Sequence, residues 1–311
     1  MRSAGVATAR AAAEAAARAV ERAAERAPAQ AAARDALAAA GVPELGGVLS
    51  EVLAQEVGQP LVFASVSGAH LYGFPSADSD VDLRGAHLLP VEDLVGLETP
   101  RETLSRMWLR DGVEMDLVTH DLAKFARLML RRNGYVLEQL LSPLVVRTTP
   151  VHAELAALAP AVLTRHHAHH YRGFARTQWR LFDRTDELKP LLYTFRALLT
   201  GIHLMRNGEV QAHLPTLAAE VPSAPPYLAE LVAAKAAAEH GLRRELSGAP
   251  APERLLADTE ALQEELAAAE QASRLPGLQG GHRELHELVV RARTGAGPGS
   301  GEGRTGATGR S

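Results

Sequence analysis

The spacing of apolar residues changes near residue 150, and this change constrains the fold more than any other feature of the chain. Before it, short apolar or alternating runs predict strands, because side chains on a strand alternate between two faces. After it, apolar residues recur every three or four positions, which is the spacing of helices that bury one face. We therefore predict an α+β fold, with a mixed β-sheet and flanking helices over residues 48–150 and an all-α domain over 151–293. The predicted strands are 61–66, 81–89 and 113–118, and the predicted helices are 121–132, 151–158, 168–182, 188–207, 227–246, 254–273 and 282–292.

Both ends of the chain differ in composition from the part between them. Residues 1–40 contain 21 alanines with six arginines among them. Alanine is the best helix former but offers little apolar area to bury, so we predict that residues 1–47 are an Ala/Arg-rich extension that is helical or disordered. Residues 294–311 are rich in Gly, Ser and Thr without an apolar anchor, which predicts a flexible Gly-rich tail. We expect neither end to carry chemistry.

The composition excludes several classes of site. The chain has no cysteine, which excludes disulfides, thiol nucleophiles, iron–sulfur clusters and cysteine zinc sites. Its formal net charge of -4 means that the chain has no overall basic field, which would have indicated nucleic-acid binding. No apolar run approaches the ~18 residues that span a bilayer. We therefore predict a cytoplasmic protein without a membrane partner, and its oligomeric state is left open.

Two aspartates, Asp80 and Asp82, lie one residue apart within an apolar run that contains Val81 and Leu83. Residues i and i+2 of a strand point to the same face, so both carboxylates share one face while the apolar residues enter the core. Two negative charges so near to each other repel unless a cation lies between them. The pair therefore predicts a metal site.

A third carboxylate would complete an oxygen-only ligand set of the kind that holds Mg²⁺. Asp116 lies in the third predicted strand between apolar neighbours. Glu114, two residues earlier, points to the same face of that strand and is the alternative third ligand. The alternative is that Asp78, Asp80 and Asp82 simply belong to a solvated loop.

A glycine turn precedes the acids. Ser67 and Gly68 follow the first predicted strand, and Asp80 lies twelve residues beyond Gly68. Glycine in such a turn lets backbone N–H groups approach a triphosphate closely. The order of strand, glycine turn and strand with two acids predicts a nucleotide-binding turn beside the metal site.

Residues 62–85, which read VFASVSGAHLYGFPSADSDVDLRG, resemble the signature of the DNA polymerase β-like nucleotidyltransferase superfamily. That signature is a hydrophobic residue, Gly and then Gly or Ser, a spacer, and Asp-x-Asp. Ser79 before the acids and Arg84-Gly85 after them resemble the bacterial and phage branch of predicted nucleotidyltransferases. Further segments that resemble this branch are 116–124, 133–141, 171–173, 189–196 and 273–276.

The resemblance implies a nucleotidyltransferase-type sheet and an enzyme that moves a nucleoside monophosphate from an NTP, with ATP favoured, to an acceptor hydroxyl with release of pyrophosphate. Asp80, Asp82 and Asp116 would be its catalytic carboxylates and its ligands for Mg²⁺ or Mn²⁺. The acceptor, whether protein, RNA or small molecule, is left open.

The resemblance also implies nucleotide binding by Ser67 and Gly68 in the turn and by Lys189, Tyr193 and Arg196 in the helical domain. The last three fall at i, i+4 and i+7, which is one face of a helix. On spacing alone, Tyr193 would pack and the two cations would stay in solvent. With the resemblance we expect both cations to face phosphate. Lys189 would act as a compact point charge, and the guanidinium of Arg196 would donate two parallel hydrogen bonds.

Position 69 departs from the signature, because Ala69 stands where that pattern has Ser or Gly. The missing hydroxyl raises the alternative of a catalytically degenerate module that binds nucleotide without turnover, unless Ser67 compensates. The helical half and the alanine-rich extension raise a further alternative, an antitoxin-like or scaffold protein. Asp80, Asp82 and Asp116 favour the enzyme, because a scaffold has no need of clustered acids.

Four histidines, at positions 166, 167, 169 and 170, raise the question of a zinc site. Histidines at i and i+3 or i+4 share a helix face, but the neighbouring sequence identifies no acid to support them. We therefore interpret this stretch as a boundary segment before the helix that carries Tyr171 and Arg172.

Overall fold

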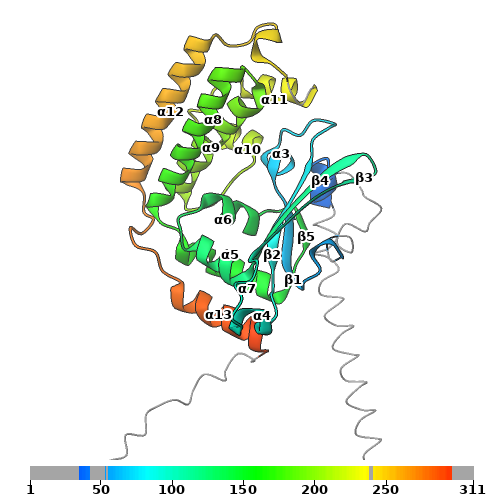
Figure 1. Ribbon diagram of the computed structural model, residues 1–311. Coiled ribbons are helices and arrows are strands. Elements are labelled where there is room, and N and C mark those ends of the chain that lie inside the picture. Colours follow the sequence, from blue (N-terminus) through cyan, green and yellow to red (C-terminus); the bar gives the residue numbers. More distant parts are fainter. Residues whose placement is uncertain (1–34, 43–52, 54, 238–240, 296–311) are drawn as a thin grey trace, which may run out of the picture.

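The computed structural model of the chain describes residues 35–42, 53, 55–237 and 241–295 (Figure 1). The predicted extension over 1–47 and the predicted tail over 294–311 therefore lie almost wholly outside the described residues. The strands are β1 (Leu61–Val66), β2 (Val81–His87), β3 (Thr103–Arg110), β4 (Val113–Asp121) and β5 (Val145–Arg147). The helices of the first half are α3 (Gly68–Tyr72), α4 (Val91–Val95), α5 (Leu122–Met129) and α6 (Gly134–Leu140). Those of the second half are α7 (Pro150–Val162), α8 (Ala168–Thr185), α9 (Leu188–Asn207), α10 (Leu214–Glu220), α11 (Leu228–Ala237), α12 (Pro252–Ala272) and α13 (His282–Thr294), with short 3-10 turns η1 (Arg165–His167) and η2 (Arg243–Glu245).

The five strands form one mixed sheet in the order β3-β4-β2-β1-β5. β2 and β4 run parallel, whereas the other neighbouring pairs are antiparallel. β1 is buried along nearly its whole length, because α6 and α7 pack against it and neighbouring strands flank it on both sides. Its sequence is accordingly a continuous apolar run rather than an alternating one. The predicted mixed sheet with flanking helices is confirmed.

Two strands, β3 and β5, were not predicted. β3 lies at the edge of the sheet, and none of its residues is fully buried, although Leu104 and Trp108 pack against the core. Apolar residues such as Met107 and Leu109 stand exposed on its other face, so its sequence shows no clear alternation of apolar and polar residues. It is joined to β4 by Asp111 and Gly112, whose φ angles are 51° and 82°. Positive φ at both residues is the geometry of a tight hairpin turn, for which Asp-Gly is a strong sequence signal. That dipeptide could have revealed the hairpin.

The second half is helical throughout its described residues 148–237 and 241–295, where the only β pairing is a single bridge between Glu187 and Leu242. Helices α8, α9 and α12 lie side by side, and α13 lies against α5 and α7 (Figure 1). α9 is apolar almost all round and is the most buried of these helices, because α8, α10, α11 and α12 all contact it. Its neighbour α11 is described to Ala237, and residues 241–246 are not α-helical, so the predicted helix 227–246 extends too far. The predicted all-α region is confirmed.

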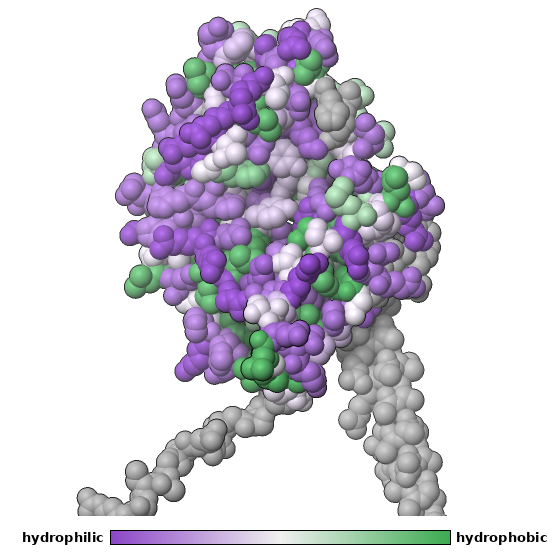
Figure 2. Space-filling view, viewed as in Figure 1, coloured by the Kyte–Doolittle hydropathy of each residue, from purple (hydrophilic) through white to green (hydrophobic). Residues whose placement is uncertain are grey.

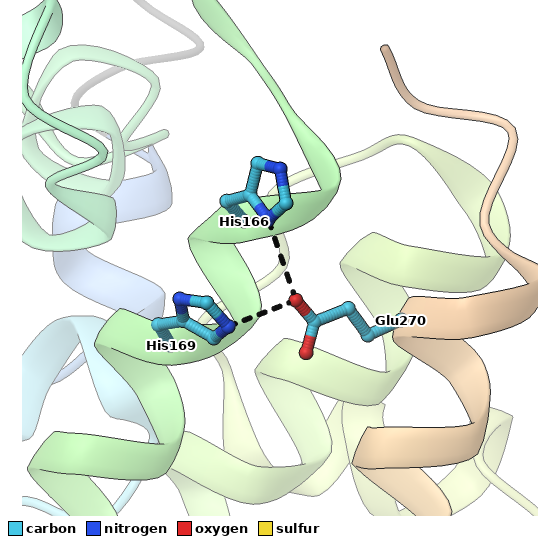
Figure 3. A group of neighbouring side chains, drawn as sticks. All are labelled: His166, His169 and Glu270. Atoms are coloured by element: carbon cyan, nitrogen blue, oxygen red, sulfur yellow. Dashed lines mark ion pairs between the residues drawn. The ribbon is translucent and has the colours of Figure 1, made fainter. Parts of the chain in front are cut away.

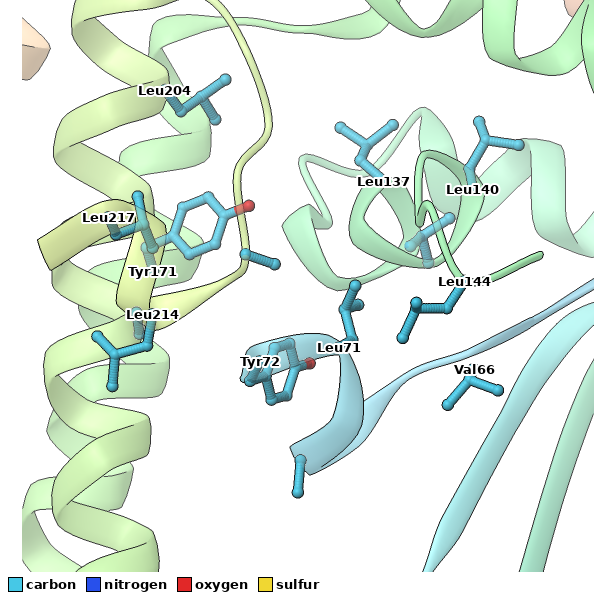
Figure 4. Close-up of a cluster of buried hydrophobic side chains, with 14 of the residues drawn as sticks. Val66, Leu71, Tyr72, Leu137, Leu140, Leu144, Tyr171, Leu204, Leu214 and Leu217 are labelled. Atoms are coloured by element: carbon cyan, nitrogen blue, oxygen red, sulfur yellow. The ribbon is translucent and has the colours of Figure 1, made fainter. Parts of the chain in front are cut away.

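The hydrophobic core continues from the sheet into the helices. Figure 4 draws members of one buried cluster from both halves, with Val66 of β1 and Leu140 of α6 on one side, Tyr171 of α8 and Leu217 of α10 on the other, and Leu71 of α3 between them. Because side chains from both halves share this core, the predicted division at residue 150 stays a prediction. The face seen in Figure 2 is mostly hydrophilic, with hydrophobic residues in small patches. Within the described part of the chain, none of the helices has the length and apolar character needed to cross a membrane.

Candidate active site

Two of the predicted carboxylates, Asp82 and Asp116, face each other on neighbouring strands. Asp82 of β2 pairs with Asp116 of β4 in the parallel register, and adjacent strands lie only about 4.8 Å apart. Val81 and Leu83, on either side of Asp82, are fully buried in the core. The alternation of the strand therefore turns Asp82 to the opposite face, as the sequence predicts, and the register brings Asp116 to the same place.

The guanidinium of Arg84 joins these two carboxylates. One of its nitrogens, Nη2, donates to Asp82 Oδ1 at 2.6 Å and to Asp116 Oδ2 at 2.8 Å. Nη1 donates to the backbone oxygen of Asp116 at 2.7 Å, and Nε donates to the Tyr135 hydroxyl at 3.2 Å. Arg84 lies two residues beyond Asp82, so strand parity places both on one face. A positive charge thus lies between the two acids, as their mutual repulsion requires.

The electrostatics of the site centre on Asp82. Burial raises the pKa of the Asp82 carboxyl; Arg84 and Lys189 oppose this shift, whereas Asp116 and Asp80 reinforce it. Asp80 itself is exposed and lies immediately before β2, outside the strand. Asp80 and Lys189 therefore lie close enough to Asp82 for their charges to act on its carboxyl.

The glycine turn lies directly against Asp82. Gly68 has a φ of +62°, and a Cβ atom at this position would lie 1.8 Å from Asp82 Oδ2. The backbone N–H of Ser67 donates to the backbone oxygen of Asp82 at 2.8 Å. The Ser67 hydroxyl oxygen is buried without a hydrogen-bond partner among the described residues. A buried hydroxyl without a partner is uncommon, and here it lies in the turn where the signature places a phosphate-binding hydroxyl.

Lys235 is a residue that the sequence analysis missed. It is fully buried, and its ammonium donates to the hydroxyls of Ser76 at 2.8 Å and Ser79 at 3.2 Å. These serines lie in the loop that leads to Asp80, so α11 supports that loop with a buried cation. The only signal was a lone lysine in the otherwise apolar segment 231–238, which also fits an ordinary surface lysine.

The structure does not bring Arg196 to the acids. The Arg196 side chain is 3% exposed and forms an ion pair of 2.7 Å with Glu138, whose side chain is 1% exposed. Its guanidinium lies 4.0 Å from the centre of the Tyr72 ring. The expectation that Arg196 faces phosphate therefore does not fit this structure, because its charge is already matched in the core. Tyr193 packs edge-on against Tyr72 and Phe74, both of which belong to the glycine-turn region.

The donor set suits a hard cation. Asp80, Asp82 and Asp116 offer only carboxylate oxygens, and Arg84 engages one oxygen each of Asp82 and Asp116, which leaves the second oxygen of each without a hydrogen bond among the described residues. Oxygen ligands of this kind suit Mg²⁺ and Mn²⁺. These three residues would hold the metal, and a metal bound there would neutralise phosphate charge and polarise an acceptor hydroxyl.

Comparison with known proteins identifies the family. Residues 47–291 match the family described as RlaP: RNA repair pathway DNA polymerase beta family. The chain belongs to this family. The match spans the sheet, the acids and the helical half, so RlaP membership agrees with the resemblance to DNA polymerase β-like nucleotidyltransferases that residues 62–85 carry.

Individual relatives of this RlaP member are uncharacterized. The protein MJ0002 of Methanocaldococcus jannaschii is 31% identical over 157 residues, which are 49% of this chain and 63% of that protein. The protein YcgL of Bacillus subtilis is 28% identical over 160 residues, which are 50% of this chain and 60% of that protein. The chain thus matches less than two thirds of the length of either relative. The crystal structure of a nucleotidyltransferase-like protein from Exiguobacterium sibiricum is 13% identical, with a TM-score of 0.30 and 80% of each chain covered.

Proposed function

We propose that this RlaP-family protein is a metal-dependent nucleotidyltransferase that moves a nucleoside monophosphate from an NTP to a terminal hydroxyl of RNA. The observation that supports this most strongly is the in-register pair of Asp82 and Asp116 beside the Gly68 turn. The family description names an RNA repair pathway, which favours an RNA end over a protein or a small molecule as the acceptor. We propose ATP as the donor and the cytoplasm, where NTPs are made and used, as the location.

The reaction forms a bond between the acceptor oxygen and the α-phosphorus and breaks the bond between that phosphorus and the oxygen leading to the β-phosphate. Pyrophosphate leaves with the electron pair of the broken bond, and the acceptor proton passes to a base. Asp116 is the proposed base, because Arg84 engages one of its oxygens and the other is left to accept a proton. Mg²⁺ or Mn²⁺ held by Asp80, Asp82 and Asp116 would supply charge neutralisation of the triphosphate.

The remaining proposed contacts come from the turn and the start of α9. Gly68 permits close approach of phosphate, and the partnerless hydroxyl of Ser67 is available to hold it in place of the hydroxyl that Ala69 lacks. Lys189 adds a compact positive charge that already acts on Asp82. Tyr193 is proposed to line the nucleotide side of the site from its position beside α3.

The test uses ATP labelled at the α-phosphate, Mg²⁺ or Mn²⁺, and RNA with a free terminal hydroxyl or the same RNA oxidised with periodate. We expect label on the intact RNA only. Asp80→Asn and Asp82→Asn should each reduce transfer at least about 100-fold, because ligand loss removes several kcal/mol of charge stabilisation. Asp183→Asn, an exposed aspartate on α8, is the matched control. Label on the protein or on a small molecule would refute the RNA acceptor, and full activity of both variants would refute the metal site.

A second candidate function is nucleotide binding without turnover. It is favoured by the Arg84 bridge, since its guanidinium already occupies one oxygen each of Asp82 and Asp116, and by the missing hydroxyl at Ala69. ATP binding in the same samples, measured by calorimetry, distinguishes the two. Binding that depends on Lys189 but gives no transfer to any acceptor would favour the binding module.

A further inference from the structure

A cluster of metal-binding side chains lies in the helical half, where the end of α12 meets the start of α8. His166 lies in η1, His169 in the first turn of α8, and Glu270 in the last turn of α12 (Figure 3). None of these residues contacts Asp80, Asp82 or Asp116 through any hydrogen bond or ion pair between described residues. The cluster is therefore separate from the candidate active site.

Both imidazoles point at the same carboxylate oxygen. His169 Nε2 lies 3.0 Å and His166 Nδ1 lies 3.6 Å from Glu270 Oε1. The three ligand atoms all lie within 4.8 Å of one another. Zinc bonds of about 2.0–2.2 Å in a tetrahedron place neighbouring ligand atoms about 3.3 Å apart. The two measured separations from Glu270 Oε1 to the imidazole nitrogens lie on either side of this value.

The surroundings hold the carboxylate in position to bind. Arg172 Nη2 donates to Glu270 Oε2 at 3.0 Å, so the second oxygen is engaged and Oε1 is left to the two imidazoles. A donor that fixes the distal oxygen of a ligating carboxylate is a common support for metal sites. The Glu270 side chain is only 9% exposed, so its orientation is set by packing as well as by this ion pair.

One ligand atom is buried without a hydrogen bond. His166 Nδ1 is sealed from solvent, and none of the described residues donates to it or accepts from it, since its 3.6 Å separation from Glu270 is too long. Buried polar atoms without partners are rare, and a metal ion would satisfy this one. The side chain of His169 is 56% exposed, which leaves an open side for metal to enter and for water to complete the coordination.

We propose that His166, His169 and Glu270 form a transition-metal site that fastens α12 to the start of α8, with Zn²⁺ as its ion. Two imidazoles and one carboxylate suit Zn²⁺, whereas Mg²⁺ prefers oxygen ligands alone. From sequence alone these histidines fit a boundary segment, because no acid lies near them in the chain. The fold supplies that acid from a helix about a hundred residues further on.

The first test is Zn²⁺ binding to the untagged full chain, freed of metal by chelation, in excess Mg²⁺ to saturate the oxygen-only site. Calorimetry should show one tight Zn²⁺ per chain and a rise in the thermal midpoint, because a ligand that binds only the folded state stabilises it. His169→Ala and Glu270→Gln should abolish tight binding. Arg172→Met should weaken it about tenfold or more, because it removes only the support.

The matched control is His286→Ala, which removes an exposed histidine on α13, four residues from His282. If His286→Ala loses tight Zn²⁺ binding and His169→Ala keeps it, the Zn²⁺ site lies on α13. That result would overturn the proposal. Because His169 is exposed, His169→Ala should leave the thermal midpoint without metal unchanged. A binding defect in this variant therefore reports on the site rather than on folding.

A spectroscopic readout makes the coordination itself visible. Co²⁺ in place of Zn²⁺ should give the intense visible absorption of a four- or five-coordinate ion, and His166→Ala, His169→Ala and Glu270→Gln should each remove it. If the cluster is only an ion pair between histidine and glutamate, neither Zn²⁺ nor Co²⁺ will bind differently to wild type and to these variants. That result would overturn the proposal.

Discussion

Arg196 of α9 and Glu138 of α6 form an ion pair of 2.7 Å that is almost completely sealed from solvent. The other carboxylate oxygen of Glu138 accepts from the Tyr72 hydroxyl at 3.1 Å, and the Tyr72 ring lies against the Arg196 guanidinium. Three helices are thereby joined: α9 from the helical half, α6, which packs against β1 and β2, and α3, which begins at Gly68. The pair thus couples the glycine turn to the helices that enclose it.

Removing one partner of this pair should destabilise the fold strongly. Arg196→Met leaves the Glu138 carboxylate buried without its cation, which should lower the free energy of unfolding by about 3–5 kcal/mol. The double variant Glu138→Leu/Arg196→Met should be less destabilised than either single variant, because no buried charge is left unpaired. Urea unfolding of the three variants measures these differences. A stable Arg196→Met that binds ATP less well would instead return Arg196 to the phosphate-binding role.

The contrast between Lys189 and Arg196 shows what helix spacing can and cannot predict. Their separation of seven residues places both on one face of α9, but it also places them about 10 Å apart along the helix axis. Lys189, in the first turn, acts on Asp82, whereas Arg196 lies two turns further into the core. Its partner Glu138 is 58 residues earlier in the chain. Only the tertiary fold could identify that partner.

The acids were predictable because strand parity is a local property, and Asp80 and Asp82 fall within the same short apolar run. The pairing of Asp82 with Asp116 was predictable only through the resemblance, because register between strands depends on the whole sheet. β3 was not predicted because apolar residues stand on both of its faces, Leu104 and Trp108 against the core and Met107 and Leu109 in solvent, so its sequence does not alternate. The roles of Lys235 and Glu270 could not be predicted, because each contacts its partners only after helices that are distant in the sequence have packed together.

The Gly68 turn permits a matched pair of substitutions. Gly68 and Gly58 have nearly the same φ, +62° and +64°, but only a Cβ at position 68 would meet Asp82. Both alanine variants should lose about 1–2 kcal/mol of stability from the left-handed backbone conformation. Gly68→Ala should in addition displace Asp82 and abolish nucleotidyl transfer. Urea unfolding and the labelled-ATP assay check both effects, and equal behaviour of the two variants would contradict the close approach.

Lys189 should contribute to ATP binding as a point charge. Lys189→Ala should weaken ATP binding by about 1.5–3 kcal/mol, the usual range for an interaction with a charged group. The same variant should raise the pKa of Asp82 further, because it removes a positive charge that lowers it. Lys189→Arg should restore only part of the affinity, since the guanidinium is larger and less strongly hydrated. ATP titration with Mg²⁺ and carboxyl NMR measure the two effects.

The control for Lys189 is Arg180→Ala, which removes an exposed cation from α8. It should leave ATP affinity unchanged, because nothing in the structure places Arg180 near the acids. Equal ATP affinities of wild type and Lys189→Ala would show that the influence of Lys189 on Asp82 is not used for substrate binding.

Buried histidines should make the fold sensitive to mild acid. Burial lowers the pKa of His120 and of His167 to about 4, and it lowers the pKa of His87, His152 and His170 as well. Below pH of about 6.5 the unfolded chain binds protons that the folded chain excludes, so stability falls as pH decreases from about 6.5 toward 4. The raised pKa of Asp82 acts in the opposite direction, since protonating that carboxyl in the folded state relieves its burial, but it is one group against several.

Urea midpoints measured at pH 7.5 and pH 5 test this pH dependence, and we expect the lower midpoint at pH 5. His120→Gln should reduce the difference between the two midpoints, because glutamine binds no proton when the chain unfolds. Its amide can still form a hydrogen bond with Thr103, the present partner of the imidazole at 3.0 Å. His286→Gln, on the exposed face of α13, is the matched control and should leave the difference unchanged. Identical midpoints at the two pH values for wild type would show that these imidazoles take up protons without unfolding, and would remove acid sensitivity as a property of this fold.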